Sequence, residues 1–304
     1  MTADTTDDEP FAGVYPAITT PFQEDGSIDF ETLRAHVRRL ETAGVDGIVP
    51  CGSTGESATL THDEHIEVVE ATVDAAEEVP VIAGAGSNAT HEAVSLSRRS
   101  EAAGADALLH ISPYYNNPEP AGMENHYRRV ADAVDIPIIV YNVPSRTGRD
   151  IDVETTLSLA EHPNITGYKA ASGDTGKISE IIERTREAEF SVISGDDGMT
   201  YPILAAGGVG TISVAANVRP TMVSELVGSA LSGDHDRARE IHHRLGPLFR
   251  TLFIETNPIP VKEAMAVEFD HAPHVRSPLS RLAPENREEL TEVLDALPEE
   301  VATA

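Results

Sequence analysis

The chain has 304 residues, of which 51 are acidic and 22 basic, so its net charge at pH 7 is −29. This charge excludes functions that need a basic surface, namely binding to nucleic acid or to anionic membranes. Forty per cent of the residues are apolar, which is enough for the core of one large domain, alone or with a small appendage.

The N-terminal segment 1–10 is acidic and polar, and we expect it to form a flexible tail. It has neither the basic start nor the apolar stretch of a signal peptide, and no apolar run approaches the ~20 residues of a membrane span. Cys51 is the only cysteine, so an intramolecular disulfide is impossible. These features predict a cytoplasmic protein with a buried, unreactive thiol.

The acidic residues are spread along the chain, and only three of the 22 basic residues are lysines. An evenly acidic, lysine-poor surface is typical of proteins that stay soluble in molar salt, where screening removes the repulsion between like charges. We therefore hypothesise a halophilic source, and expect the protein to lose its fold and activity on dialysis into low salt.

Eight short apolar segments alternate with amphipathic ones. The expected strands are residues 13–19, 47–51, 81–84, 107–112, 137–142, 165–170, 191–195 and 210–215. The expected helices lie near residues 29–43, 61–77, 90–103, 120–134, 152–161, 175–187, 198–206 and 220–231. Buried strands that each precede a helix indicate a parallel sheet covered on both faces. Eight such units predict an α/β fold of the (β/α)8 TIM barrel type.

Local signals support these boundaries. Asp29 precedes a periodic run, Thr61–Glu64 has the form of a capping box, and Gly44 and Gly104 stand where helices should end. The alternative fold is a doubly wound open sheet, which usually has a glycine-rich dinucleotide turn after its first strand. The segment Thr19–Phe22 has no such turn.

No strand is expected after residue 232. Residues 235–254, 259–268 and 285–297 have helical patterns, which predict a small C-terminal helical extension. The predicted domains are a barrel of residues 11–232 and a C-terminal helical region of residues 233–304.

Chemistry in such a barrel gathers at the carboxyl ends of the strands. There, Lys169 lies one residue before the end of the apolar segment Ile165–Ala170. Burial disfavours an ammonium ion and lowers its pKa, which frees the amine to attack a carbonyl and form a Schiff base. A lysine that reaches the surface from a strand end is the alternative, and this segment alone does not decide between them.

Other polar groups follow neighbouring strands. Gly52–Ser57 offers hydroxyl and N–H groups for a carboxylate or phosphate but lacks the lysine of a P-loop. Three of the seven tyrosines, Tyr114, Tyr115 and Tyr141, also fall at strand ends, where a phenol can relay protons. Each alone could be a rim residue without chemistry, but together with Lys169 they favour catalysis.

A metal site is a weak alternative. His62 and His65 share one helix face, but no third ligand is evident in the sequence. His242 and His243 are adjacent and cannot face the same way on a helix. We therefore expect no metal.

These motifs resemble those of the dihydrodipicolinate synthase / N-acetylneuraminate lyase family of pyruvate-dependent class I aldolases. The segments that carry the resemblance are Gly52–Ser57, Pro113–Asn116, Tyr141–Gly148, Gly167–Lys169, Ser194–Asp197 and Glu255–Lys262. Together they are specific, and the resemblance covers nearly the whole chain after the tail. It implies a homotetramer, built as a dimer of dimers, that needs no metal or organic cofactor because a lysine supplies the electron sink.

The resemblance also implies roles for individual residues. Lys169 would form the Schiff base with pyruvate, and Tyr141 would move protons and hold the pyruvyl group. Ser53 would link Tyr141 to Tyr115, which would come from a neighbouring subunit. Thr54 would hold the pyruvate carboxylate. The residues expected to close the pocket through backbone carbonyls are Gly195 and Ile212.

Arg146 would hold the carboxylate of aspartate semialdehyde, because a guanidinium matches a carboxylate in a bidentate pair. The alternative is an arginine that only pairs with a local acid. Ser53 stands where the family usually has threonine but keeps the hydroxyl. Ala170 stands where many synthases have glutamate.

The resemblance further implies a binding site for L-lysine, an inhibitor, at the dimer interface. The matching positions are Ser57, Ala58, His62, His65, Asn88, Glu92 and Tyr114.

The expected activity is condensation of pyruvate with L-aspartate 4-semialdehyde, giving 4-hydroxy-tetrahydrodipicolinate in lysine and diaminopimelate biosynthesis. The nearest alternative is an aldolase of the same family that cleaves 2-keto-3-deoxygluconate or its 6-phosphate. A non-catalytic lysine-binding regulator is a more distant one, because it would not need Lys169, Tyr141 and Tyr115 together.

Overall fold

The computed structural model describes residues 10–269 and 271–298, so most of the predicted tail lies outside the described residues. One parallel sheet forms the centre of the molecule, and its strands follow the order β1-β7-β6-β5-β4-β3-β2. The strands are β1 (Gly13–Pro16), β2 (Ile82–Gly84), β3 (Ala107–Ile111), β4 (Ile138–Asn142), β5 (Ile165–Ala170), β6 (Ser191–Ser194) and β7 (Gly210–Ser213).

The segment predicted as the second strand, 47–51, is shortened to two isolated parallel bridges, Ala17 with Val49 and Ile48 with Val81. Pro50 has no N–H group to donate, and Cys51 has a φ of 56°, so the extended conformation ends there. Val49 N still donates to Pro16 O at 2.9 Å and Ile82 N to Ile48 O at 2.9 Å. These bonds close the sheet between β1 and β2, and the predicted barrel fold is confirmed.

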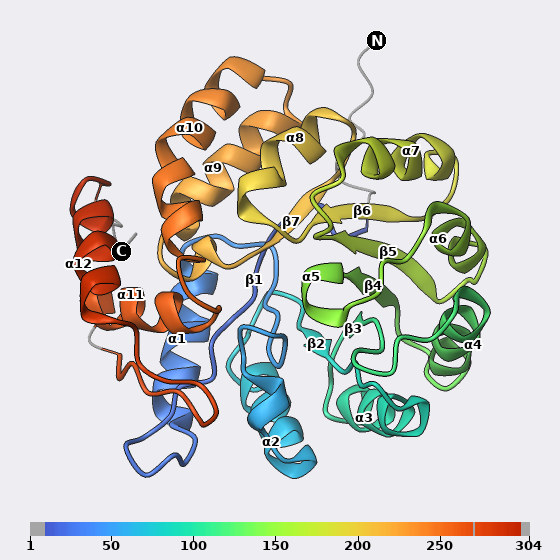
Figure 1. Ribbon diagram of the computed structural model, residues 1–304, viewed down its shortest axis with the longest axis horizontal. Coiled ribbons are helices and arrows are strands. Elements are labelled where there is room, and N and C mark those ends of the chain that lie inside the picture. The colour runs from blue at the N-terminus through green and yellow to red at the C-terminus, as the bar shows by residue number, and fades with distance from the viewer. Residues whose placement is uncertain (1–9, 270, 299–304) are drawn as a thin grey trace.

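Helices surround the strands (Figure 1). The helices that alternate with the barrel strands are α1 (Phe30–Thr42), α2 (His62–Val73), α3 (Thr90–Ala102), α4 (Pro120–Ala131), α6 (Val153–Ala160), α7 (Thr175–Thr185), α8 (Thr200–Ala205) and α9 (Pro220–Leu231). The short elements at strand ends are α5 (Pro144–Thr147) and the 3-10 turns η1 (Ser57–Thr59), η2 (Asp197–Met199) and η3 (Ala215–Asn217).

The predicted helix ends are confirmed where caps were expected. Asp29 caps α1 by accepting from Thr32 N, and Thr61 and Glu64 form the capping box of α2. Gly44 and Gly104 have φ values of 78° and 94°, the left-handed conformation that ends a helix.

Three further helices follow: α10 (His235–Thr251), α11 (Ile259–Phe269) and α12 (Pro284–Asp295). They lie on one side of the barrel, with α12 at the outer edge (Figure 1). Their apolar side chains share one cluster with Val14 of β1 and with α9. The C-terminal helices therefore pack on the side of the barrel where β1 and β7 pair.

Side chains alternate between the two faces of each strand. Leu109, Tyr141 and Ile193 belong to a cluster inside the barrel, whereas Leu108, Val140 and Val192 pack outside against the helices. A residue such as Lys169, next to Tyr141 in register, therefore reaches the inside of the barrel.

Candidate active site

Lys169 and Tyr141 lie side by side on neighbouring parallel strands. They are register partners in β5 and β4, and Lys169 Nζ lies 4.2 Å from the centre of the Tyr141 ring. Lys169 is 6% exposed and Tyr141 8%. The strand-end lysine is therefore buried rather than extended to the surface.

Burial is the main influence on both groups. It lowers the pKa of the Lys169 amine to about 7, opposed by the Asp197 carboxylate and assisted by the Arg146 guanidinium. Much of the amine is therefore neutral and nucleophilic at neutral pH. Burial also raises the pKa of Tyr141 to about 12, so the phenol keeps its proton and can donate it in a hydrogen bond.

The turn after β6 makes room for the lysine. A Cβ atom at Gly195 would lie 2.8 Å from Lys169 Cε, so only glycine fits here without a shift. Asp197, further along the turn, is buried and accepts from Ser213 Oγ at 2.5 Å and from two backbone N–H groups after β7 at 3.0 and 2.9 Å. Burial raises the pKa of this carboxyl group to about 6.

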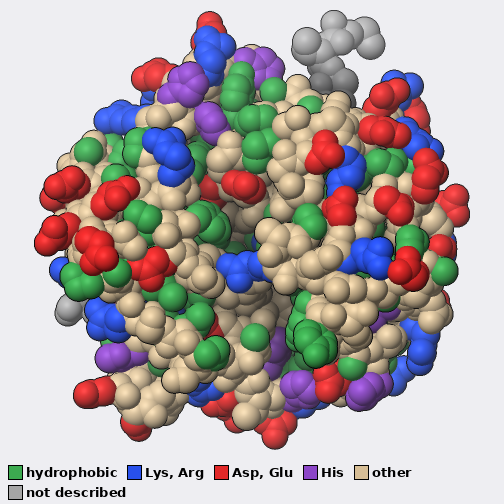
Figure 2. Space-filling model, in the orientation of Figure 1, with side chains coloured by type: hydrophobic (Ala, Val, Ile, Leu, Met, Phe, Trp, Pro, Cys, Tyr) green, Lys and Arg blue, Asp and Glu red, His purple; other side chains and the backbone are tan. Residues whose placement is uncertain are grey.

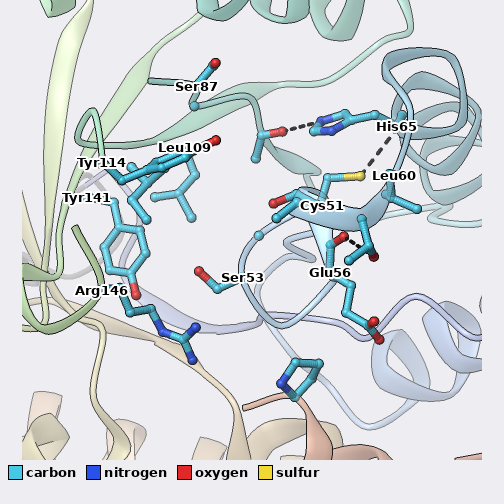
Figure 3. A pocket seen from close by; sticks show the side chains of 18 of the residues that line it. Cys51, Ser53, Glu56, Leu60, His65, Ser87, Leu109, Tyr114, Tyr141 and Arg146 are labelled. Atoms are coloured by element: carbon cyan, nitrogen blue, oxygen red, sulfur yellow. Dashed lines mark hydrogen bonds between the residues drawn. The ribbon is translucent and has the colours of Figure 1, made fainter. Parts of the chain in front are cut away.

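The loop of Gly52–Ser57 brings two hydroxyl groups to the same place. Figure 3 shows the Ser53 hydroxyl directed towards Tyr141 and Arg146. Thr54 is 3% exposed, and its Oγ1 accepts a hydrogen bond from Asn257 Nδ2 at 3.0 Å. Thr20 Oγ1 donates to Gly55 O at 2.7 Å, which fixes the loop against the segment that follows β1.

A buried ion pair anchors this loop from the other side. The Glu56 carboxylate pairs with Lys262 Nζ on α11, and the two side chains are 1% and 3% exposed. Lys262 Nζ also donates to His274 O at 2.8 Å, and Arg276 N donates to Glu56 Oε2 at 3.0 Å. The C-terminal region therefore holds the loop that carries Ser53 and Thr54.

Arg146 lies on α5, directly after β4. Its Nη2 donates to Asn257 O at 3.0 Å. Within residues 10–269 and 271–298 the guanidinium forms no ion pair with an acid, so the alternative of a purely local pair finds no support.

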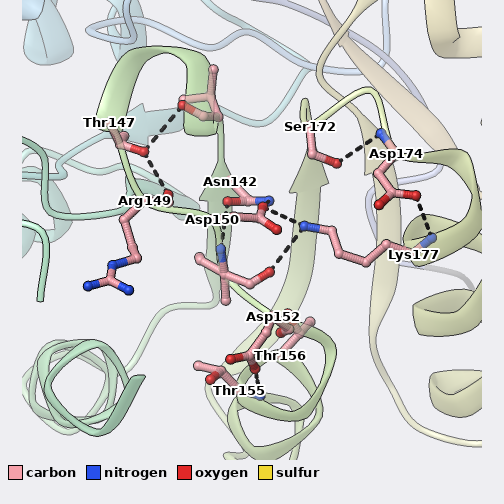
Figure 4. A network of polar contacts seen from close by, with 12 residues as sticks. Asn142, Thr147, Arg149, Asp150, Asp152, Thr155, Thr156, Ser172, Asp174 and Lys177 are labelled. Carbon is pink, nitrogen blue, oxygen red and sulfur yellow. Dashed lines mark hydrogen bonds and ion pairs between the residues drawn. The ribbon is translucent and has the colours of Figure 1, made fainter. Parts of the chain in front are cut away.

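A polar network holds the segment that carries Arg146 (Figure 4). Asn142 Nδ2 donates to Asp150 Oδ1 at 2.7 Å and to the Tyr168 hydroxyl at 2.8 Å. Asn142 Oδ1 accepts from Ile151 N at 3.1 Å, and Lys177 Nζ pairs with Asp150 at 2.5 Å. The far end of the segment, at Asp150 and Ile151, is thereby tied to β4 and to α7.

A cavity of about 790 Å³ opens at this end of the barrel, within the usual range for a small-molecule site. The predicted residues that line it are Ser53, Thr54, Tyr141, Arg146, Lys169 and Gly195. Two predicted residues lie elsewhere: Tyr115 is 90% exposed, and Ile212 is 1% exposed in the barrel core. Acidic side chains are scattered over this face of the molecule rather than gathered in one patch (Figure 2).

The motifs and the geometry agree with a comparison against known families. A model of the dihydrodipicolinate synthetase family matches residues 10–297. The chain belongs to this family.

Relatives within the family are similar over almost their whole length. A protein of Haloarcula marismortui named 4-hydroxy-tetrahydrodipicolinate synthase is 65% identical over 287 residues, which cover 94% of each chain. This halophile relative supports the salt adaptation expected from the composition.

Two solved structures of the family have nearly the same fold. Chloride-inhibited dihydrodipicolinate synthase from Acinetobacter baumannii, complexed with pyruvate, is 38% identical with a TM-score of 0.92, covering 94% of this chain and 98% of that one. The enzyme from Cyanidioschyzon merolae with lysine bound is 36% identical with a TM-score of 0.90, covering 95% of this chain and 99% of that one.

A second cavity, of about 400 Å³, adjoins the first and shares Ser53, Tyr141 and Arg146 with it. The positions expected to bind lysine that line it are Ser57, Ala58, His62, His65, Glu92 and Tyr114. Asn88 does not line it, and its carbonyl accepts from Asn116 Nδ2 at 2.8 Å. Six of the seven positions expected from the resemblance therefore line one cavity.

His65 in this cavity has a defined partner. Its Nε2 donates to Gly84 O at 2.6 Å, and burial lowers its pKa to about 4, so the ring is neutral at neutral pH. No group of three or more His, Cys, Asp or Glu side chains that could hold a metal ion occurs among the described residues. Within the same ranges, every helix is too short or too polar to cross a membrane.

Three residues at the site were not predicted to take part: Glu56, Asn257 and Asp197. All lie in segments that resemble the family, but no local pattern indicates what their side chains contact. The only sequence signal that points to one of them is Lys262, because it is one of three lysines in an acidic chain. An unpaired buried lysine would be costly, so a buried acid partner could have been sought.

Proposed function

We propose that the protein condenses pyruvate with L-aspartate 4-semialdehyde to give 4-hydroxy-tetrahydrodipicolinate, in lysine and diaminopimelate biosynthesis. The observation that carries this proposal is that the Arg146 guanidinium, which forms no ion pair within the described part of the chain, lines the same cavity as the buried Lys169 amine. The Lys169 amine suits the ketone of pyruvate, and the Arg146 guanidinium suits the carboxylate of a second substrate. The names of the relatives support the same activity.

In this reaction the neutral Lys169 amine attacks the pyruvate ketone, and loss of water leaves a protonated imine. Tyr141, having given its proton to the departing hydroxide, takes one from the pyruvate methyl group, and the resulting enamine carbon attacks the aldehyde of the second substrate. The amino group of that substrate then attacks the imine carbon, closes the ring and displaces Lys169, which restores the free amine. Tyr141, protonated and in contact with Lys169, is placed to give protons to the departing hydroxide and to the new alkoxide. The lysine serves as the electron sink, which is why no cofactor enters the proposal.

Further contacts complete the proposed site. Thr54 would hold the pyruvate carboxylate, and the Gly195 and Ile212 carbonyls would close the pocket. Ser53 would relay protons between Tyr141 and Tyr115. Tyr115 would be supplied by a second copy of the chain in a dimer of dimers. Its 90% exposure on a strained turn, with a φ of 72°, supports contact with another subunit.

The aldolase acting on 2-keto-3-deoxygluconate or its 6-phosphate is the alternative. Ala170, the departure from many synthases, packs in the apolar cluster outside the barrel and lines neither cavity. It therefore gives no support to a changed substrate. A regulator without activity would have no need for a buried amine in contact with Tyr141.

The test compares substrates in molar KCl. Condensation with the semialdehyde is followed with a reductase-coupled NADPH assay, and pyruvate release from the two sugar acids is measured in parallel. Arg146→Ala is expected to raise the KM for the semialdehyde by about 100-fold, the scale of a lost charged contact, while half-saturating pyruvate for imine formation changes little. Rapid sugar-acid cleavage, or equal loss of both steps in the variant, would contradict the proposal.

We further propose that L-lysine binds in the smaller cavity and inhibits. Glu92 is the acid there that suits the α-ammonium group, and a lysine-bound relative supports this assignment. Millimolar lysine is expected to slow condensation, and Glu92→Gln to weaken that inhibition at least tenfold because one charged contact is lost. A rate that does not respond to lysine would remove this site.

A further inference from the structure

Asn257 lies where the two proposed carboxylate sites meet. It belongs to the segment between α10 and α11, is 4% exposed and lines both cavities. Its side chain contacts Thr54, and its backbone carbonyl contacts Arg146. One residue thus touches the group proposed for pyruvate and the group proposed for the semialdehyde.

The side-chain contact determines where the Thr54 hydroxyl hydrogen can go. An amide NH2 group can only donate, so when Asn257 Nδ2 approaches Thr54 Oγ1 at 3.0 Å, the hydroxyl oxygen is the acceptor. The Thr54 hydrogen then stays available for another oxygen. Since Thr54 lines the larger cavity, a carboxylate bound there can accept it.

The backbone contact limits the orientations that the Arg146 guanidinium can adopt. The bond from Arg146 Nη2 to Asn257 O, at 3.0 Å, uses one donor and leaves the others for a ligand. This fixes the direction of the planar group before a carboxylate arrives, which reduces the entropy lost on binding.

The segment around Asn257 is itself anchored at both ends. Glu255 Oε1 accepts from Ala283 N at 2.9 Å and from Asn286 Nδ2 at 2.7 Å. On the other side, Lys262 of α11 forms the buried pair with Glu56. The C-terminal helices therefore hold Asn257 against the barrel.

We propose that Asn257 is a positioning residue that directs the Thr54 hydroxyl hydrogen towards the pyruvate carboxylate and holds Arg146 for the second carboxylate. This inference rests on the proposed function for the identity of the two substrates. It assigns to the C-terminal extension a part in substrate recognition as well as in packing.

The test uses Asn257→Asp, which keeps the shape but replaces the donor with an acceptor. The carboxylate would take the Thr54 hydrogen and place a negative charge beside the bound pyruvate. Half-saturating pyruvate for borohydride trapping on Lys169 is expected to rise at least tenfold, with trapping at saturation retained. Asn257→Ala, which removes the whole amide and puts no negative charge in its place, should show a smaller rise and serves if the aspartate variant does not fold.

A double-mutant cycle separates positioning from packing. In a Thr54→Val background, without a hydroxyl to direct, Asn257→Ala should change half-saturating pyruvate by less than about twofold, within the usual error of additive effects. Asn164→Asp is the matched control, because Asn164 Nδ2 donates to the Ala131 and Val134 carbonyls, outside both cavities. It should alter stability without altering pyruvate binding.

The inference is overturned if Asn257→Asp and Asn257→Ala leave half-saturating pyruvate unchanged. It is also overturned if the effect of Asn257→Ala is the same with and without the Thr54 hydroxyl. Trapping needs only pyruvate, so these results stand even if the second substrate is a different aldehyde, and failure of the proposed function is detected separately by the substrate comparison.

Discussion

Lys169→Ala is expected to abolish covalent trapping of pyruvate by borohydride and to lower the condensation rate by at least about 10³-fold. The variant loses both the nucleophile and the electron sink, and Tyr141 has no means to replace either. Intact mass after reduction in the presence of pyruvate measures the first effect, and the coupled assay measures the second.

Lys177→Met provides the control, because Lys177 is also largely buried but pairs with Asp150 outside the cavity. Borohydride trapping of pyruvate should persist in Lys177→Met. Trapping that remained in Lys169→Ala would place the nucleophile on another amine, and the proposed mechanism would then fail.

Lys262→Met is expected to lower the free energy of unfolding by about 3–5 kcal/mol, since removing one partner of a buried ion pair leaves the other charge uncompensated. Glu56, 1% exposed, cannot reach water without moving the loop that carries Ser53 and Thr54. Weaker pyruvate binding should therefore accompany the loss of stability. Denaturant unfolding in molar KCl measures the first effect, and half-saturating pyruvate for trapping the second.

Two variants control this experiment. Glu56→Gln combined with Lys262→Met removes both charges and should recover part of the lost stability. Arg184→Met breaks the exposed pair with Glu154, whose side chains are 39% and 77% exposed, and should cost less than about 1 kcal/mol. If Lys262→Met and Arg184→Met lowered the free energy of unfolding equally, the buried Glu56–Lys262 pair would contribute no more than an exposed pair.

The barrel could be predicted because the sequence signals that indicate its strands and helices are local. Apolar strands, capping residues such as Thr61 and stop signals such as Gly44 each act within a few residues. The second strand was predicted too long. Its apolar pattern continues through Pro50 and Cys51, but the extended conformation ends there because Pro50 has no N–H group and Cys51 has a positive φ. The division at residue 232 stays a prediction.

The site could be predicted only in part, for a related reason. Parallel strands end at one edge of the barrel, so Lys169, Tyr141 and Thr54 could be placed together from topology. Asn257 meets Thr54 across 203 residues of sequence, and no spacing rule links them. Tyr115 is exposed and lines neither cavity, so its contact with a second copy of the chain stays a prediction.

The placement of the three lysines has a chemical consequence. Lys169 and Lys262 are 6% and 3% exposed, and the Lys177 side chain is 9% exposed. Every other basic side chain apart from histidine is an arginine, whose guanidinium is far less nucleophilic than a free amine. An enzyme that handles a reactive aldehyde thus presents almost no side-chain amines to it. Under the proposed mechanism this placement would limit adventitious adducts on the surface and leave Lys169 as the side-chain amine that reacts with the substrates.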